Sequence, residues 1–145
     1  MKHKVLIGVL SLSAFLSCSK SDKKNSTCGG KDVICTMDFR TITLSVLNVD
    51  STPKQLDSFY SAFSGSDNII LDSKDISAEQ LQMMQRYGSY PVISDAQRDK
   101  LSSGKNTAVY FVGYQDGIKV MEHSLVVTHD CCHIQLKSEN KPVVF

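Results

Sequence analysis

The sequence predicts a mainly β domain, an antiparallel β-sandwich of the immunoglobulin-like or transthyretin-like kind with one or two short helices. Two observations predict this class. About seven short runs of β-branched, aromatic or alternating hydrophobic residues are separated by turn residues roughly every ten positions. The chain has 145 residues, of which 41% are hydrophobic, which suits one domain with its own core. Tryptophan, the usual core marker of immunoglobulin domains, is missing.

The first part of the domain opens with strands. Residues 40–46 alternate hydrophobic and hydroxyl side chains, which is the period-two pattern of a strand with one buried face. Turn-forming residues follow at 50–54. Two further strands are expected at residues 55–63 and 69–71, separated by a turn at 65–68.

The middle of the chain has a helical pattern instead. Ser77 and Gln80 fit a capping box, and apolar residues at helical spacing follow, so a short helix of about ten residues is expected to end near Gly88. Residues 90–93 are expected to be extended because the residue before a proline avoids the helical region. Residues 95–101 favour one or two more helical turns.

The last part of the domain returns to strands. Two runs rich in valine, leucine and aromatic residues, at 107–114 and 118–128, flank an Asp-Gly pair that is preferred in tight hairpins. Short strands are expected at residues 134–136 and 143–145, with a turn between them. The chain therefore ends as it began, in a sheet.

The first residues indicate an export signal. Residues 1–17 combine a basic start with a hydrophobic run that is shorter than the ~20 residues of a membrane-spanning helix. Residues 14–18 resemble a bacterial lipobox, with Phe15 and Leu16 in place of the usual leucine and small residue. The resemblance implies cleavage before Cys18 and acyl chains on Cys18 that anchor the protein in a membrane. An ordinary secretory signal with a chance cysteine is the alternative.

The same resemblance implies a location. Ser19 follows Cys18 where lipoproteins retained at the inner membrane carry aspartate, so the expected site is the cell outer membrane, and a periplasmic or surface-facing orientation stays open. The polar residues that follow are typical of a flexible tether. The chain is therefore divided into a signal peptide (1–17), a lipidated cysteine and tether (18–34) and a β-sandwich domain (35–145).

Four cysteines remain if Cys18 is lipidated: Cys28, Cys35, Cys131 and Cys132. An even number in an exported domain favours disulfides. A bond between the adjacent Cys131 and Cys132 is disfavoured, because neighbouring Cα atoms lie ~3.8 Å apart, below the usual disulfide range. Both other full pairings join the first two cysteines to the last two, and one such long loop contributes about 4–5 kcal/mol on the chain-entropy model. A single bridge that leaves two free thiols is the alternative.

The cluster His129-Asp130-Cys131-Cys132-His133 also suggests an alternative function in metal binding or thiol redox chemistry. Thiolate and imidazole are the ligands that zinc and copper prefer. Adjacent cysteines, however, do not have the two-to-four residue spacing of structural zinc sites. We therefore expect structural disulfides here and no cofactor, and keep His129, Cys131, Cys132 and His133 as metal ligands only in the alternative.

The two ends of the domain resemble small, mostly uncharacterised outer-membrane lipoproteins of Bacteroidota. The resemblance lies in the cysteine-bearing entry into the first strand at residues 35–43, in the Asp-Cys-Cys-His motif at 130–133, and in residues 56–60. The Gly-Pro that these proteins carry near their end is replaced by residues 140–142 (NKP). The resemblance implies a lipid anchor and a β fold, and no established activity.

Catalytic signals are weak, and no catalytic residue is expected. No Gly-x-Ser-x-Gly sequence occurs, and most acidic residues lie at predicted turns. The formal net charge of +1 excludes a nucleic-acid partner. The expected partners are the membrane, through the anchor, and an unidentified envelope protein or glycan. Aromatic residues that could line such a surface or fill the core are Phe59, Tyr60, Phe63, Tyr87, Tyr90, Tyr110, Phe111 and Tyr114.

Overall fold

The computed structural model describes Cys28, residues 33–66 and residues 68–145. The expected signal peptide, Cys18 and most of the expected tether lie outside the described residues. Within them the chain forms eight strands, one α-helix and two 3-10 helical segments, in the order β1 (Thr41–Leu47), β2 (Ser58–Phe63), β3 (Ile69–Asp72), η1 (Ser73–Asp75), α1 (Ala78–Tyr87), β4 (Ser89–Ser94), η2 (Asp95–Lys100), β5 (Thr107–Gln115), β6 (Ile118–His129), β7 (Ile134–Leu136) and β8 (Val143–Val144).

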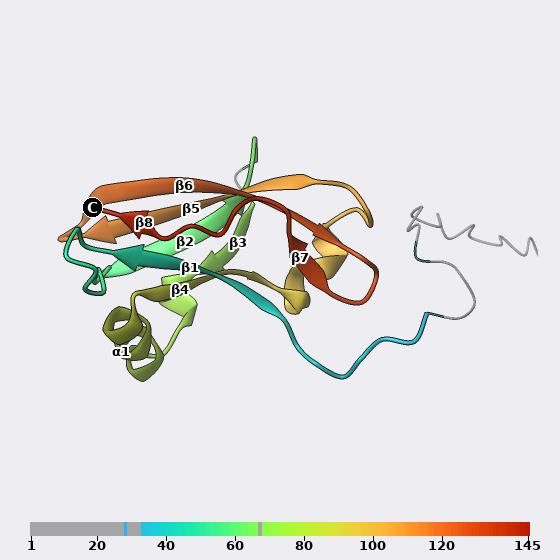
Figure 1. Cartoon of the computed structure of the whole chain (residues 1–145), viewed down its shortest axis with the longest axis horizontal. Coiled ribbons are helices and arrows are strands. Elements are labelled where there is room, and N and C mark those ends of the chain that lie inside the picture. Colours follow the sequence, from blue (N-terminus) through green and yellow to red (C-terminus); the bar gives the residue numbers. More distant parts are fainter. Residues whose placement is uncertain (1–27, 29–32, 67) are drawn as a thin grey trace, which may run out of the picture.

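The strands form two sheets, so the prediction of a mainly β fold is confirmed. One sheet has the order β4-β1-β8 and the other has the order β3-β2-β5-β6-β7. Figure 1 shows them as two layers, with β1 and β4 below the longer strands β5 and β6. The largest pairing joins β5 to β6, which are connected by the predicted hairpin turn at Asp116 and Gly117. Both turn residues have positive φ, as this type of tight turn requires.

The expectation of antiparallel pairing is wrong at one place. β8 runs parallel to β1, with Val46 beside Val143 and Leu47 beside Val144. Strands joined by a short turn must pair antiparallel, whereas strands far apart in sequence can pair in either direction. β8 reaches the edge of β1 only after a long excursion of the chain through the other sheet, so the local sequence of residues 143–145 carries no information about its direction.

The two sheets share one hydrophobic core. The alternation in β1 buries Ile42, Leu44 and Val46, as the sequence predicts. The aromatic centre of the core crosses between the sheets, because the ring of Phe59 lies 5.3 Å from that of Tyr90 and 5.4 Å from that of Phe111, measured between centroids. Other fully buried side chains, which come from both sheets and from the loop before β2, are Leu56, Val92, Ile93, Val109, Leu125, Val127 and Ile134.

The predicted helix is confirmed as α1, and η2 supplies the additional helical turns predicted after β4. Ser77 and Gln80 make the reciprocal capping box, and Gly88 ends the helix in a left-handed conformation with φ 60°. A Cβ atom at Gly88 would lie 2.5 Å from the carbonyl oxygen of Val46, so only glycine fits there. α1 buries no residue completely and lies on the outside of β4 (Figure 1).

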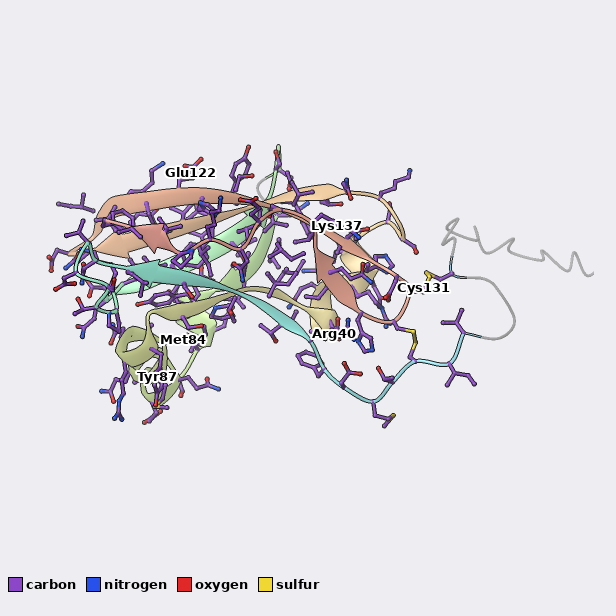
Figure 2. The ribbon with its side chains drawn as sticks, viewed as in Figure 1. Arg40, Met84, Tyr87, Glu122, Cys131 and Lys137 are labelled. Carbon is purple, nitrogen blue, oxygen red and sulfur yellow. A yellow bond between two sulfur atoms is a disulfide. The ribbon has the colours of Figure 1, made fainter. Side chains whose placement is uncertain are left out.

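The two ends of the molecule differ in character. The β5–β6 hairpin and the C-terminus lie at one end, and β7 and the turn that contains Cys131 lie at the other (Figures 1 and 2). β6 connects them as the longest strand, with 12 residues. Among the residues that the structure describes, no helix has both the length and the hydrophobicity to cross a membrane.

Candidate functional site

Two disulfides join the N-terminal segment to the turn between β6 and β7, as the sequence predicts. They link Cys28 to Cys131 and Cys35 to Cys132, with Cα–Cα distances of 5.4 and 5.2 Å. Of the two pairings that the sequence leaves open, this is the one formed. Adjacent cysteines can both reach one segment because they lie in a turn, where Cys131 adopts φ 81°. The disulfide at Cys28 also ties the domain to a residue within the expected tether.

Asp130 organises this turn, which we call the disulfide turn (residues 130–133). One carboxylate oxygen accepts hydrogen bonds from the backbone N–H groups of Cys132 (3.1 Å) and His133 (2.9 Å), and the other accepts one from the side chain of Gln135 (2.6 Å). The bond from the His133 N–H is the main reason that the pKa of Asp130 is lowered. The Asp-Cys-Cys-His order therefore has a structural explanation, because the aspartate fixes the loop that presents both cysteines.

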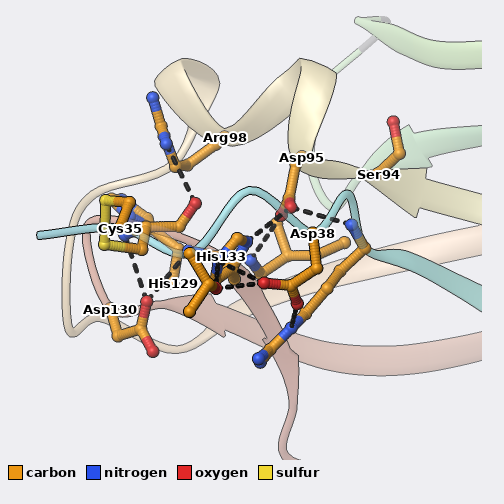
Figure 3. A network of polar contacts seen from close by, with 12 residues as sticks. Cys35, Asp38, Ser94, Asp95, Arg98, His129, Asp130 and His133 are labelled. Carbon is orange, nitrogen blue, oxygen red and sulfur yellow. Dashed lines mark hydrogen bonds and ion pairs between the residues drawn. A yellow bond between two sulfur atoms is a disulfide. The ribbon is translucent and has the colours of Figure 1, made fainter.

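His133 is the centre of a polar cluster formed by Thr36, Asp38, Asp95 and His133, which we call the His133 cluster (Figure 3). The residue is 6% exposed. Its Nδ1 lies 2.8 Å from a carboxylate oxygen of Asp95, and its Nε2 lies 2.8 Å from the hydroxyl of Thr36 and 3.4 Å from a carboxylate oxygen of Asp38. One buried ring therefore connects the N-terminal segment, the disulfide turn and η2.

Asp95 holds three parts of the chain together. Besides its contact with His133, its carboxylate accepts hydrogen bonds from the backbone N–H of Arg40 (2.9 Å) and from that of Ile134 (2.8 Å). Burial raises the pKa of Asp95, but the hydrogen bonds from His133 and from these two N–H groups lower it more, so the net shift is downward. The carboxylate is therefore ionised at neutral pH while its side chain is 9% exposed.

Asp38 is the second carboxylate beside His133. Its hydrogen bonds with the Thr36 hydroxyl and with the Arg40 guanidinium lower its pKa to about 2. Arg40 Nε lies 3.0 Å from the carboxylate. The imidazole of His133 is thus held between two ionised carboxylates, one buried and one at the surface.

His129 lies apart from His133 and makes different contacts. Its Nδ1 accepts a hydrogen bond from the backbone N–H of Cys131 (3.1 Å), so Nε2 carries the proton and donates to the carbonyl oxygen of Leu101 (3.3 Å). Both histidines are therefore occupied by protein groups, and the disulfides occupy the four thiols. In the described part of the chain, no group of three or more His, Cys, Asp or Glu side chains could hold a metal ion.

The contacts of Thr36 favour a structural role over a nucleophilic one. Thr36, His133 and Asp95 have the spacing of a hydroxyl–imidazole–carboxylate triad. The Thr36 hydroxyl, however, donates its proton to Asp38 and is left as an acceptor for the imidazole. A nucleophile activated by histidine needs the opposite arrangement, in which the hydroxyl donates to the ring.

Sequence reasoning missed most of the residues that contact His133 and the disulfide turn. Thr36 and Asp38 follow Cys35 closely, so their nearness to the disulfide turn could have been found from the disulfide expectation. Nothing in the sequence around Asp95 and Arg98 indicates that they lie near the disulfide turn, because η2 approaches this turn only in the folded chain. Arg98 donates a hydrogen bond to the carbonyl oxygen of Cys132 (2.9 Å), which fixes the outer side of the turn.

Six of the eight expected aromatic residues divide between the core and one open surface, whereas Phe63 is partly buried against the core and Tyr87 is exposed on α1. Phe59, Tyr90 and Phe111 are buried, whereas the outer side of the five-stranded sheet carries Tyr60, Tyr110 and Tyr114. We call these tyrosines together with Glu122 the tyrosine face. The rings of Tyr60 and Tyr114 lie 6.3 Å apart between centroids. A hollow of about 370 Å³ lies beside Tyr60 and is lined by side chains that include Tyr60, Tyr110, Val112 and Glu122.

Tyr60 on this face is half-buried. Burial, and then the neighbouring Tyr114, raise the pKa of Tyr60. Glu122 marks the same face in Figure 2, on the side of β6 that points away from the other sheet. The tyrosine face thus combines aromatic rings, a shallow hollow and one carboxylate.

Comparison of the chain with protein-family models, with curated proteins and with solved structures found no match in any of the three. The resemblance to lipoproteins of Bacteroidota therefore stays a prediction.

Proposed function

We propose that this protein is an envelope lipoprotein, anchored in the outer membrane through acylated Cys18, whose β domain has a non-catalytic binding role. The observation that supports this most is the pair of disulfides between the N-terminal segment and the disulfide turn. Disulfides persist in oxidising compartments outside the cytoplasm. They also account for four of the five cysteines, and the fifth is Cys18, at the position that the lipobox resemblance assigns to lipid.

The disulfide to Cys28 sets how far the domain can stand from the bilayer. About ten residues separate Cys18 from Cys28, and they span at most about 33–36 Å when fully extended. The end of the domain that carries the disulfide turn is thus the membrane-proximal end in this proposal. The β5–β6 hairpin lies at the opposite end of the long strand β6.

The proposed fold class is a β-sandwich of the immunoglobulin-like or transthyretin-like kind. Its support is the single core between two sheets, in which Tyr90 of one sheet packs against Phe59 and Phe111 of the other. The edge pairing of β8 with β1 is parallel, so the sandwich is not purely antiparallel.

The tyrosine face is the surface that we propose for a binding role. Aromatic rings that lie partly open beside a hollow and a carboxylate are suited to a glycan, since sugar rings pack their C–H faces on aromatic side chains while a carboxylate accepts hydrogen bonds from hydroxyl groups. Binding of envelope glycan fragments should weaken at least tenfold in Tyr60→Ala and Tyr110→Ala and remain unchanged in Tyr87→Ala. Tyr87 lies on α1 and is 59% exposed, so its variant is a matched control.

The anchor is tested separately from the fold. Metabolic labelling with a fatty-acid analogue should label the natural chain and the Ser19→Ala control but not Cys18→Ala, and only Cys18→Ala should leave the detergent-rich phase. A Cys18→Ala chain that still partitions with membranes and detergent contradicts the proposal.

The metal or thiol-redox alternative predicts four free thiols and bound zinc or copper, whereas two disulfides predict an intact mass lower by about four hydrogens than that of the reduced chain.

A further inference from the structure

The segment around Cys35 that leads into β1 exposes several hydrophobic side chains, and we call it the apolar segment (residues 33–39). The exposed fractions are 52% for Val33, 94% for Ile34, 101% for Met37 and 67% for Phe39. Single exposed hydrophobic residues are normal on a protein surface. Four within seven consecutive residues concentrate exposed hydrophobic surface in one short segment, and concentrated apolar surface of this kind marks contacts with another surface.

In this segment polar side chains contact the domain, whereas hydrophobic side chains are exposed. Thr36 and Asp38 turn toward the protein, where both contact the buried His133. Met37 and Phe39 alternate with them and are exposed. Within residues 36–39 the polar residues thus face the domain and the hydrophobic residues face outward, with a bend of the chain at Met37, and Val33 and Ile34 are exposed just before Cys35.

The apolar segment is also held in place. Cys35 within it is bonded to Cys132, and at its end the backbone N–H of Arg40 donates a hydrogen bond to Asp95. The ion pair between Asp38 and Arg40 adds a local restraint. The hydrophobic side chains are therefore presented on a covalently fixed framework at the same end of the molecule as the disulfide turn.

We propose that residues 33–39 dock on the lipid bilayer in which Cys18 is anchored, with Val33, Ile34, Met37 and Phe39 in the region between headgroups and acyl chains. This inference rests on the proposed lipid anchor. About ten residues lead from Cys18 to Cys28, and a stretch of this number can span at most about 33–36 Å. The anchor thus keeps this end of the domain near the membrane surface, and partly inserted apolar side chains then add to the hold of the acyl chains.

The charge of the connecting residues suits the same surface. Lys20, Lys23 and Lys24 lie between the anchor and the first disulfide, against a single acidic residue, Asp22. Basic residues next to a membrane anchor are attracted to anionic headgroups. Three features therefore favour a lipid bilayer as the surface that this segment contacts: the proposed acylated residue, the basic residues that follow it and the exposed hydrophobic side chains.

The natural absence of tryptophan gives a direct test. The full lipidated chain carrying Met37→Trp is reconstituted into vesicles of phosphatidylethanolamine and phosphatidylglycerol that contain a phospholipid brominated near the top of its acyl chains. We expect a blue-shifted tryptophan emission that the bromines quench by at least half. The matched control is Ile118→Trp, at a position that is 68% exposed in β6 next to the hairpin turn, and its emission should be that of tryptophan in water, without quenching.

The outcomes separate the docking from the anchor. Flotation of the protein with vesicles reports the anchor, and quenching in the floated fraction reports the docking. If the Met37→Trp chain floats but its emission equals that of the Ile118→Trp chain, the docking alone is overturned. A blue shift without bromine quenching also overturns it, because the segment then contacts protein, such as a second copy. A chain that does not float overturns both proposals.

A second measurement uses the natural side chains and so does not depend on a variant within the segment. Chloramine-T, a charged oxidant that partitions poorly into lipid, converts exposed methionine to the sulfoxide. In the soluble Cys18→Ala chain, Met37 should be oxidised faster than Met83 of α1, which is 51% exposed. In the vesicle-bound natural chain the order should reverse, with Met37 slowed at least fivefold relative to Met83. An unchanged order in vesicles contradicts the docking.

Discussion

Removal of one disulfide should cost much less than removal of both, because the two bridges share a small ring. Alone, each bridge closes a loop with a sequence separation of 103 or 97 residues, which stabilises the fold by about 4.7 kcal/mol on the chain-entropy model. When one bridge is present, the other closes only the ring made by residues 28–35 and residues 131–132. That ring has about ten residues and adds about 2.7 kcal/mol.

The perturbation is paired replacement of cysteine by serine, which leaves no free thiol in the two bridges. Cys28→Ser with Cys131→Ser, or Cys35→Ser with Cys132→Ser, should each lower the free energy of unfolding by about 2.7 kcal/mol, and the fourfold replacement should lower it by about 7 kcal/mol. Since whole domains are stable by about 5–15 kcal/mol, the fourfold replacement should remove about half or more of the free energy of unfolding.

The assay is denaturant unfolding of the soluble Cys18→Ala chain, followed by far-ultraviolet circular dichroism. The oxidised chain is the reference, and the same chain after chemical reduction should match the fourfold variant. Two results would refute the shared-ring reasoning: a cost near the ~4.7 kcal/mol of a full loop for either single pair, or a fourfold variant that loses no more stability than a single pair does.

Three further predictions concern single side chains. Asp95→Asn should lower the free energy of unfolding by about 2–3 kcal/mol, because a buried carboxylate loses its charge-assisted hydrogen bonds. Burial raises the pKa of Asp95, but its hydrogen bonds lower the pKa by more, so the net value lies below the usual 3.8. The contribution of Asp95 to folding stability is therefore fully present above pH 3.8 and is lost as the pH falls through the folded-state pKa. Thermal unfolding in a pH series should therefore show less acid destabilisation in Asp95→Asn than in the natural chain, and equal acid destabilisation would argue against the role of Asp95. Gly88→Ala should destabilise by about 1–3 kcal/mol in denaturant unfolding, through its positive φ and its approach to Val46, and by clearly more than Gly104→Ala, which has a positive φ but open space around it. Thr128→Val should stabilise the fold by about 1 kcal/mol and so raise the melting temperature, because the buried Thr128 hydroxyl has no hydrogen-bond partner among the described residues. A fall in melting temperature would contradict this prediction.

The local elements were predictable because their signals lie within a few residues of one another. The capping box of Ser77 and Gln80, the left-handed Gly88 and the Asp-Gly hairpin turn are each decided by short-range backbone chemistry. The alternation of residues 40–46 likewise identified the buried face of β1. The direction of β8 was not predictable, since its partner is nearly a hundred residues away and the strand itself has only two residues.

The site was predictable in its covalent chemistry and not in its polar partners. Cysteine number and the strained geometry of a bond between adjacent cysteines favoured two full pairings, and nothing local distinguishes them. The metal ligands considered in the sequence, His129 and His133, are buried by contacts with Leu101 and with Asp95. These partners come from η2 and the loop after it, which carry no pattern that refers to the disulfide turn. Contacts of this kind depend on the packing of the two sheets.

The disulfide between Cys28 and Cys131 also determines how the domain bears mechanical load. A pull on the chain before Cys28 enters β6 directly at the disulfide turn and bypasses the hundred or so residues that lie between the two cysteines in sequence. The force is then spread along β6, which is hydrogen-bonded to β5 on one side and to β7 on the other. β1 and the core beneath it are spared, so tension at the N-terminus loads the largest strand pairing in the molecule rather than peeling the fold from its first strand.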